Sequence, residues 1–290
     1  MFKRKIIKTT ITINGESEEL TWVEGEKFNQ VSHEGLRVSF LSNFGNGSMY
    51  PSATIIIYGL PIEKIDKIIR LRWGSKEALN SFIKVEVGEE GMPLIPEYYG
   101  NITFARLDTT SAPDVAVIIE SLVGVREKQT LVSATSWPDG AKLQNIVGEI
   151  CDEMGWQLEN NNVDLTIGAG NLQDTSIEKI SNLCRHYEIN MYVEPDLIAI
   201  SNTGMARELA IPIVSPSNGL LSYPTSTIQG VNFQCLYNPL IRFGGKVQVK
   251  DSAVKMANGE WLIIGIRTHL EANTPNGNWV MEVNAKYAGG

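Results

Sequence analysis

The sequence predicts a mainly β protein of the α+β class, with two antiparallel β-barrels and a small α/β domain inserted between them. Short runs of alternating apolar and polar residues, bounded by turn residues, fill residues 1–123 and 224–290. The two longest amphipathic helical patterns lie between these regions, in residues 124–204. Residues 205–223 are irregular and contain Pro, Ser and Gly, so we expect a linker or a long arm there.

The first β region begins with a strand at Lys5–Ile13, and Asn14-Gly15 predicts a hairpin turn into Leu20–Val23. A short helix at Ile62–Leu71 is expected to start with Pro61 in its first helical position. Five further strands are expected, at Leu36–Leu41, Ala53–Tyr58, Phe82–Val87, Tyr98–Leu107 and Val115–Leu122. The β-branched run in Ala53–Tyr58 is typical of a strand buried on both faces. Seven strands with one helix favour a barrel or a sandwich.

The middle region changes to a helical period. Apolar residues in Leu143–Met154 recur at helical spacing, and Gly155 is a natural end for that helix. Thr175 and Glu178 form the pattern of a capping box at the start of a second helix. A compact hairpin is expected next, with strands at Met191–Glu194 and Leu197–Ser201 joined by Pro195-Asp196. These elements predict a small α/β domain.

The last β region contains three β-patterned runs, Val231–Val249, Gly259–Asn273 and Gly277–Tyr287. Turn signals separate or interrupt them at Asn238-Pro239, Gly244-Gly245, Asn258-Gly259 and Asn276-Gly277. None of these runs contains a plausible catalytic set, so the region by itself predicts only a small antiparallel barrel.

The composition is that of an ordinary globular chain, with 290 residues, 43% hydrophobic and 20% charged, and a formal net charge of −8. An acidic surface argues against a sequence-independent grip on a nucleic-acid backbone, which requires clusters of Lys and Arg. The simplest interpretation of the acidic charge is solubility. A more specific one is that acidic side chains line a passage for DNA and keep the DNA from binding.

The three cysteines, Cys151, Cys184 and Cys235, are an odd number at wide spacing, which favours core packing over disulfides or metal ligation. The N-terminus is basic, but its apolar residues alternate with polar ones, which indicates a strand and not a signal peptide. No apolar run approaches the length of a membrane span. We therefore expect the protein to be made in a reducing cytoplasm and kept there until assembly.

The residues that could carry chemistry are scattered. His33, His186 and His269 have no second His or Cys close in sequence, so no metal site is expected. Nucleophile-elbow, P-loop and dinucleotide-binding motifs are absent, and the glycine-rich stretch Gly168–Asn171 is interpreted as a loop.

Two adjacent carboxylate pairs are the candidates for a glycosidase site, and both are interpreted as solvated charges. Glu89-Glu90 is expected in a hairpin turn, and Asp152-Glu153, with Glu149, on a helix exterior. We therefore predict no catalytic, cofactor-binding or metal-binding residue, no cofactor, and no enzymatic activity. The six tryptophans are too dispersed to suggest a sugar-binding platform and fit core or rim positions: Trp22, Trp73, Trp137, Trp156, Trp261 and Trp279.

Three sets of segments resemble one family. They are Pro51–Leu60 with Val85–Gly88 and Tyr99–Ile102, then Leu143–Trp156 with Thr175–Tyr187 and Met191–Ser201, then Leu236–Val247 with Trp261–His269 and Gly277–Trp279. In order and spacing they resemble the baseplate hub proteins of contractile, myovirus-type phage tails, in the superfamily of late control protein D and the type VI spike hub domain. Gly59, Tyr99 and Trp261 stand where that pattern usually has Asn, Phe and Tyr.

The resemblance implies a structural role in the virion, at the tail baseplate, after assembly in the cytoplasm of a host bacterium. It implies a homotrimer in which each subunit contributes two tube-type barrels to a pseudo-hexameric ring. Such a ring joins the hexameric tail tube, or a tube-initiator protein, to a trimeric central spike. The middle domain would face wedge or other tail-tip proteins, and DNA would pass through the lumen without specific binding during ejection.

The related type VI spike proteins continue into a needle, whereas this sequence stops at Gly290, so we expect the needle to be a separate polypeptide. Acidic side chains are expected to be over-represented on the lumen face. Two alternative functions remain at this point, a tail-associated peptidoglycan hydrolase and a cell-surface sugar-binding module.

Overall fold

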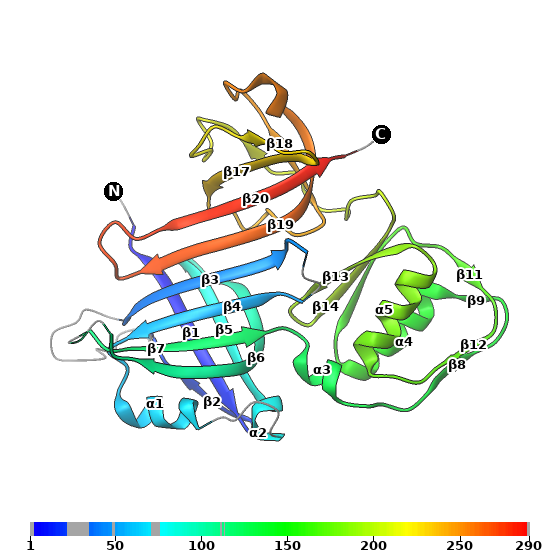
Figure 1. Cartoon of the computed structure of the whole chain (residues 1–290), viewed down its shortest axis with the longest axis horizontal. Coiled ribbons are helices and arrows are strands. Elements are labelled where there is room, and N and C mark those ends of the chain that lie inside the picture. Colours follow the sequence, from blue (N-terminus) through cyan, green and yellow to red (C-terminus); the bar gives the residue numbers. More distant parts are fainter. Residues whose placement is uncertain are drawn as a thin grey trace.

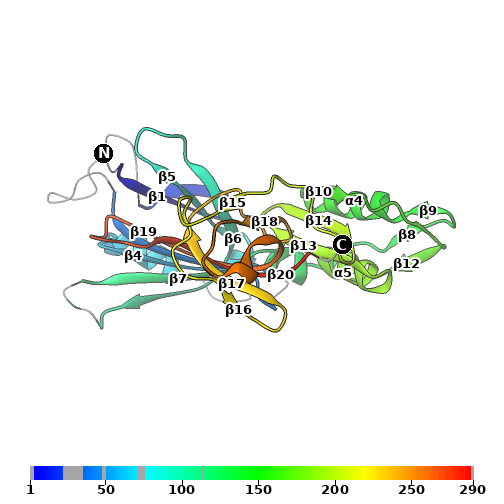
Figure 2. The same ribbon diagram turned by 90° about the horizontal axis from the view of Figure 1, so that it is seen from above.

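The computed structural model describes residues 3–21, 35–47, 50–70, 76–110, 112 and 114–288. In these ranges the protein is mainly β, as predicted, with one large sheet and a smaller α/β unit beside it (Figure 1). Seen from above, the α/β unit extends away from one end of the large sheet (Figure 2). None of the helices in the described ranges is long and apolar enough to cross a membrane. Val23, His33, Leu71, Trp22, Trp73 and Gly290 lie outside the described residues.

The large sheet joins strands from both ends of the chain. Its main path runs through β16 (Thr225–Ser226), β17 (Gly230–Leu236), β20 (Trp279–Tyr287), β19 (Gly259–Ala272), β3 (Arg37–Gly45), β4 (Ser52–Tyr58), β7 (Ala116–Leu122), β6 (Ile95–Asp108), β5 (Ser81–Glu89), β1 (Lys5–Ile13) and β2 (Glu16–Glu19). Two more strands, β18 (Lys246–Val249) and β15 (Ile213–Val214), extend from β19. Among the described pairings of this sheet only β15 with β18 is parallel.

The first and last β regions meet where β19 pairs with β3. This antiparallel ladder spans eight residue pairs, from Gly265 opposite Gly45 to Ala272 opposite Val38. The two regions therefore share one continuous sheet. The closure of each region into a barrel of its own stays a prediction.

Burial alternates along β4, so the prediction that this strand is buried on both faces is wrong. Ala53, Ile55 and Ile57 are buried, whereas Thr54 and Ile56 are only half-buried. The first set packs with core residues of β3 and β7 such as Phe40 and Ile119. The second set lies on the opposite face of the sheet, because successive strand residues point to opposite sides.

The N-terminal hairpin forms as predicted, but its second strand starts earlier. Asn14 and Gly15 both have positive φ, +50° and +88°, as a two-residue turn of this kind requires. Such a turn places Glu16 directly opposite Ile13, so the strand that pairs with β1 is Glu16–Glu19 and begins before the expected Leu20. The short helix α1 (Ile62–Ile69) likewise follows Pro61, which is its N-cap and not its first helical residue.

The middle region contains a three-stranded sheet of β10 (Gln157–Asn161), β14 (Leu197–Asn202) and β13 (Ile189–Glu194), with β10 parallel to β14. Helices α4 (Leu143–Met154) and α5 (Ser176–His186) bury their apolar faces against it. Its remaining elements are α3 (Val125–Gln129), β8 (Thr135–Trp137), β9 (Ala141–Lys142), β11 (Thr166–Ile167) and β12 (Gly170–Leu172). The short helices α2 (Lys76–Leu79), α3 and the 3-10 turn Lys255–Ala257 were not predicted.

The two long helices differ in how well their ends were predicted. Gly155 ends α4 at φ +74°, and Trp156 N donates to Cys151 O at 2.9 Å, as a glycine C-cap should. The prediction of a capping box at the start of α5 is wrong. Thr175 is the N-cap, but within the described residues its buried hydroxyl has no hydrogen-bond partner. Glu178 turns instead toward Lys128, 3.8 Å away.

The three cysteines are buried and free, which confirms their assignment to the core. Burial raises the pKa of each thiol, Cys151, Cys184 and Cys235, to about 12. At neutral pH these groups therefore remain neutral, apolar packing residues.

Candidate functional site

One face of the large sheet is covered by the core and the other is open to solvent. We call the second surface the open face. Its side chains include Leu41 and Asn43 on β3, Thr54 on β4, Phe104 on β6, Glu120 on β7, Gln234 and Leu236 on β17, Arg267 and His269 on β19, and Val280 and Glu282 on β20. Leu41, Phe104 and Leu236 are 38%, 49% and 50% exposed, which shows that the surface stays uncovered along its width.

The strand registers align these side chains into rows that run across the sheet. One row starts at Leu236 and continues through Val280, His269, Leu41, Thr54 and Glu120 to Phe104. It crosses seven strands, three of them from the last β region and four from the first. The open face is therefore one surface built by both β regions.

The middle of this surface is hollowed. A shallow groove of about 390 Å³ lies over β3, β4, β19 and β20, and Thr54, Gln234, Arg267, His269 and Glu282 contribute to its lining. Its lining mixes polar side chains with the apolar Leu41 and Val280, and it is too open to enclose a small ligand.

Charges of both signs lie on the open face. Arg267 Nη1 is 3.8 Å from Glu282 Oε2 on the neighbouring strand, and His269 Nε2 is 3.8 Å from Glu271 Oε1. At the far edge, Arg37 Nη1 is 3.9 Å from Asp114 Oδ2. Hydrogen bonds from Thr110, and then the charge of Arg106, hold the pKa of Asp108 below its usual range. Each arginine of this surface thus has a carboxylate nearby.

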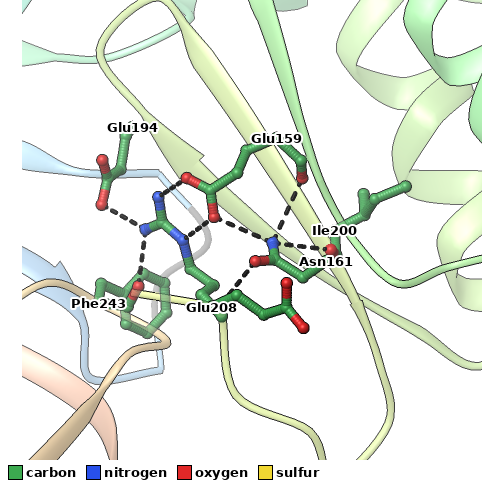
Figure 3. A network of polar contacts seen from close by, with 7 residues as sticks. Glu159, Asn161, Glu194, Ile200, Glu208 and Phe243 are labelled. Atoms are coloured by element: carbon green, nitrogen blue, oxygen red, sulfur yellow. Dashed lines mark hydrogen bonds and ion pairs between the residues drawn. The ribbon is translucent and has the colours of Figure 1, made fainter. Parts of the chain in front are cut away.

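A buried ion network fixes the arm that precedes the last β region (Figure 3). Arg207 is 4% exposed, and its guanidinium donates to Glu159 at 2.7 and 2.8 Å, to Glu194 at 2.6 Å and to Phe243 O at 2.9 Å. The hydrogen bonds from Arg207 hold the pKa of Glu159 below its usual range. The network links residues 205–223 to both the middle sheet and the loop before β18.

The loop before β18 also packs directly on the middle domain. Gly244 lies so close to the ring of Tyr192 that an added Cβ would be 2.5 Å from it, and its φ is +79°. Phe243 meets the same ring edge to face at 5.1 Å between centroids. The Gly244-Gly245 turn therefore shapes a contact between domains as well as a strand connection.

The histidines and carboxylates considered for chemistry are dispersed. His186 is exposed at the end of α5, and His269 lies on the open face. Asp152, Glu153 and Glu149 are exposed on α4, and Glu89 pairs with Lys5, so these carboxylates are solvated or surface-paired as predicted. In the described ranges no three His, Cys, Asp or Glu side chains are grouped to hold a metal ion.

The tryptophans within the described residues do not form a platform. Trp156 is 6% exposed and fills the core next to α4. Trp279 packs against Tyr237 and lies under the ammonium group of Lys5, while Trp137 and Trp261 are on separate strands.

Sequence reasoning missed Arg207 and the hydrogen-bonded pair Glu97 and Tyr237. Arg207 is a lone charge in an irregular stretch, and its carboxylate partners come from strands 48 and 13 residues away, so no local pattern marks it. Glu97 lies in a run that alternates only imperfectly because of a bulge.

A largely antiparallel sheet with one open face, and an α/β unit to one side, define a mainly β protein. The chain belongs to the baseplate hub gp41 family, whose model matches residues 26–279. This family assignment confirms the resemblance to baseplate hub proteins. A structural role as a component of the phage tail follows from it.

Solved structures share the fold at low sequence identity. A 43 kDa tail protein of prophage MuSo2 from Shewanella oneidensis has a TM-score of 0.60 and 8% identity, over 98% of this chain and 97% of that one. A tail protein from Neisseria meningitidis has a TM-score of 0.59 and 8% identity, over 97% and 96%. The E. coli c3393 protein, a component of the type VI secretion system, has a TM-score of 0.55 and 10% identity, over 96% and 76%. No curated protein sequence is significantly similar to this chain.

Proposed function

We propose that three copies of this chain form the ring at the centre of the baseplate, with the open face of each copy turned toward the lumen. The observation that carries this proposal is the row of side chains that crosses seven strands of both β regions without a break. A closed ring needs a wide wall from each subunit, and the sheet that carries this row is the largest in the described chain. Edge strands that meet a neighbouring copy would also be protected from uncontrolled pairing.

The ring would join the hexameric tail tube, or a tube-initiator protein, to a trimeric central spike. Two β regions per subunit give three copies a sixfold arrangement of similar units on one side and threefold symmetry overall. The middle domain extends away from the sheet (Figure 2) and is the part available to wedge or other tail-tip proteins. Assembly in the host cytoplasm fits the three buried, free thiols.

DNA would pass this surface without being held. Sequence-independent binding to DNA comes from cations that neutralise phosphates, and each arginine of the open face already has a carboxylate nearby. The expected acidic excess on the lumen face stays a prediction. A structural role without catalysis is part of the same proposal.

A charge reversal on the open face tests whether it faces DNA. The variant Glu120→Lys with Glu282→Lys adds two cations to it, and we expect genome release from assembled tails to slow at low salt. The delay should shrink as salt rises, because each phosphate contact is weakened by counterion competition.

The matched control is Glu149→Lys with Glu153→Lys, which changes the net charge equally but on the exposed side of α4. It should leave the rate of release unchanged. Equal rates for the two double variants would show that the open face does not border the DNA path.

A further inference from the structure

Glu97 is a buried carboxyl that a β-bulge turns out of the sheet register. On β5, Val85 lies opposite Tyr98 and Glu86 lies opposite Pro96, so Glu97 is the extra residue of β6. A bulge of this kind re-aims a side chain that regular pairing would place elsewhere. Here the carboxyl is 6% exposed, and a buried acid outside the regular ladder requires specific partners.

Its partners come from the two other parts of the chain. Tyr237, directly after β17, donates its hydroxyl to Glu97 Oε2 at 2.6 Å. The Tyr237 ring is held edge to face against Trp279 at 6.0 Å, and its backbone N–H donates to Trp279 O at 3.0 Å. Arg242 in the same loop is the cation that acts on Glu97, and Glu194 at the end of β13 is the anion.

Glu97 therefore joins the first β region to the last β region. Arg207 donates both to Glu194 on β13 and to Phe243 O, so the middle domain and the arm are tied to the same loop, residues 237–245. On the neighbouring strand β5, the charged residue beside the bulge is Glu86, which pairs with Lys84 at 2.9 Å.

Burial raises the pKa of Glu97 to about 7, against the hydrogen bond from Tyr237 and the charge of Arg242, and Glu194 adds to the increase. An ordinary solvated glutamic acid titrates at about 4.3. The Glu97 carboxyl thus ionises near pH 7 while the junction is closed, and at a much lower pH once water reaches it.

We propose that Glu97 is a proton-controlled latch, whose neutral form holds the loop 237–245 against β6 and whose ionised form loosens that contact. The ionised carboxylate is poorly solvated in the closed junction and gains hydration when the loop moves away. This property belongs to the single chain and does not depend on the ring.

The direction of the pH dependence follows from proton linkage. The pKa of Glu97 is higher while the loop 237–245 is closed on β6 than after it opens. The stabilisation of the closed junction is therefore fully present below the pKa that Glu97 has in the open state. It is lost as the pH rises through about 7. Opening should therefore become more favourable between weakly acidic and weakly alkaline pH.

Hydrogen exchange of the full chain, corrected for the intrinsic pH dependence of exchange, measures this opening. For amides of residues 237–245, we expect the opening constant to rise on the order of tenfold between about pH 6 and about pH 8. Glu97→Gln keeps an acceptor for Tyr237 and cannot ionise, so its opening constant should be flat over this range. The control Glu149→Gln on α4 should behave as the wild type.

A second variant keeps the test decisive if Glu97→Gln folds poorly. Tyr237→Phe removes a hydrogen bond that lowers the pKa of Glu97, so the pH midpoint of opening should move upward. A merely structural role of Tyr237 would change protection at all pH values without moving the midpoint. A pH-independent wild type, an unshifted midpoint in Tyr237→Phe, or wild-type pH dependence in Glu97→Gln would each overturn the proposal.

Discussion

Arg207 shows how one buried charge can organise a segment that lacks regular structure. Its side chain is 2% exposed, and its guanidinium donates hydrogen bonds to two carboxylates and a backbone carbonyl. Removing one partner of a buried ion pair leaves the others without compensation, which costs more than the pair itself contributes. Arg207 thus holds the start of the arm at residues 205–223, and the pairing of β15 with β18 holds its middle.

We predict that Arg207→Ala lowers the free energy of unfolding by about 3–5 kcal/mol, because Glu159 and Glu194 would be left without their cation. Urea denaturation with an unchanged m-value would measure the loss. Arg70→Ala is the control, since Arg70 pairs with Asp66 on the exposed surface of α1 and should cost less than about 1 kcal/mol. Equal effects of the two substitutions would contradict the role given to Arg207.

Helix α4 is an element whose two glycines have opposite roles. Gly155 ends the helix at φ +74°, a conformation that other residues adopt with strain, although an added Cβ would meet no atom within 4 Å. Gly148 lies inside the helix, and an added Cβ would contact only Leu158 at 3.6 Å, an ordinary distance. Replacing glycine by alanine should therefore change the stability in opposite directions at these two positions, which are seven residues apart.

Gly155→Ala should destabilise the protein by about 1 kcal/mol, and Gly148→Ala should stabilise it by about 0.5–1 kcal/mol. Thermal or urea unfolding of the two variants beside the wild type checks the pair, and each serves as the control of the other. A stabilising Gly155→Ala would mean that α4 does not end at this C-cap.

The elements that the sequence predicts well are those with a local cause. The end of α4 at Gly155 and the turn at Asn14-Gly15 depend on the conformation of a few neighbouring residues. Thr175 and Glu178 match a capping box, yet Glu178 lies near Lys128, a residue far away in sequence, and tertiary contact overrides the local pattern. The alternation in β4 was hidden because its half-buried residues are also β-branched.

At the scale of the whole molecule, the sequence predicts two β regions and an insert but not how they join. The pairing of Leu270 with Phe40 links strands 230 residues apart, and no periodicity within either strand encodes that choice. The open face is built by strands of both regions. For the same reason, the sequence predicts that a lumen face exists but not which residues form it. Glu97 and Tyr237 escape prediction because each gains its role from the other, 140 residues away.

The single sheet also determines what a ring of these subunits can look like. Because β19 and β3 are hydrogen-bonded over eight residue pairs, the two β regions of one copy should move as one wall and not as independent domains. Curvature around a passage would then come from sheet twist and from the contacts between copies.

Electron microscopy of the assembled tail tip would test directly whether this chain forms a ring with its open face toward the lumen. We predict three copies of the chain around the axis, directly below the tail tube. Arg267, Thr54 and Glu120 should face the passage, and the middle domain should lie outside. A single copy, or a ring in which the open face is buried against another protein, would contradict it.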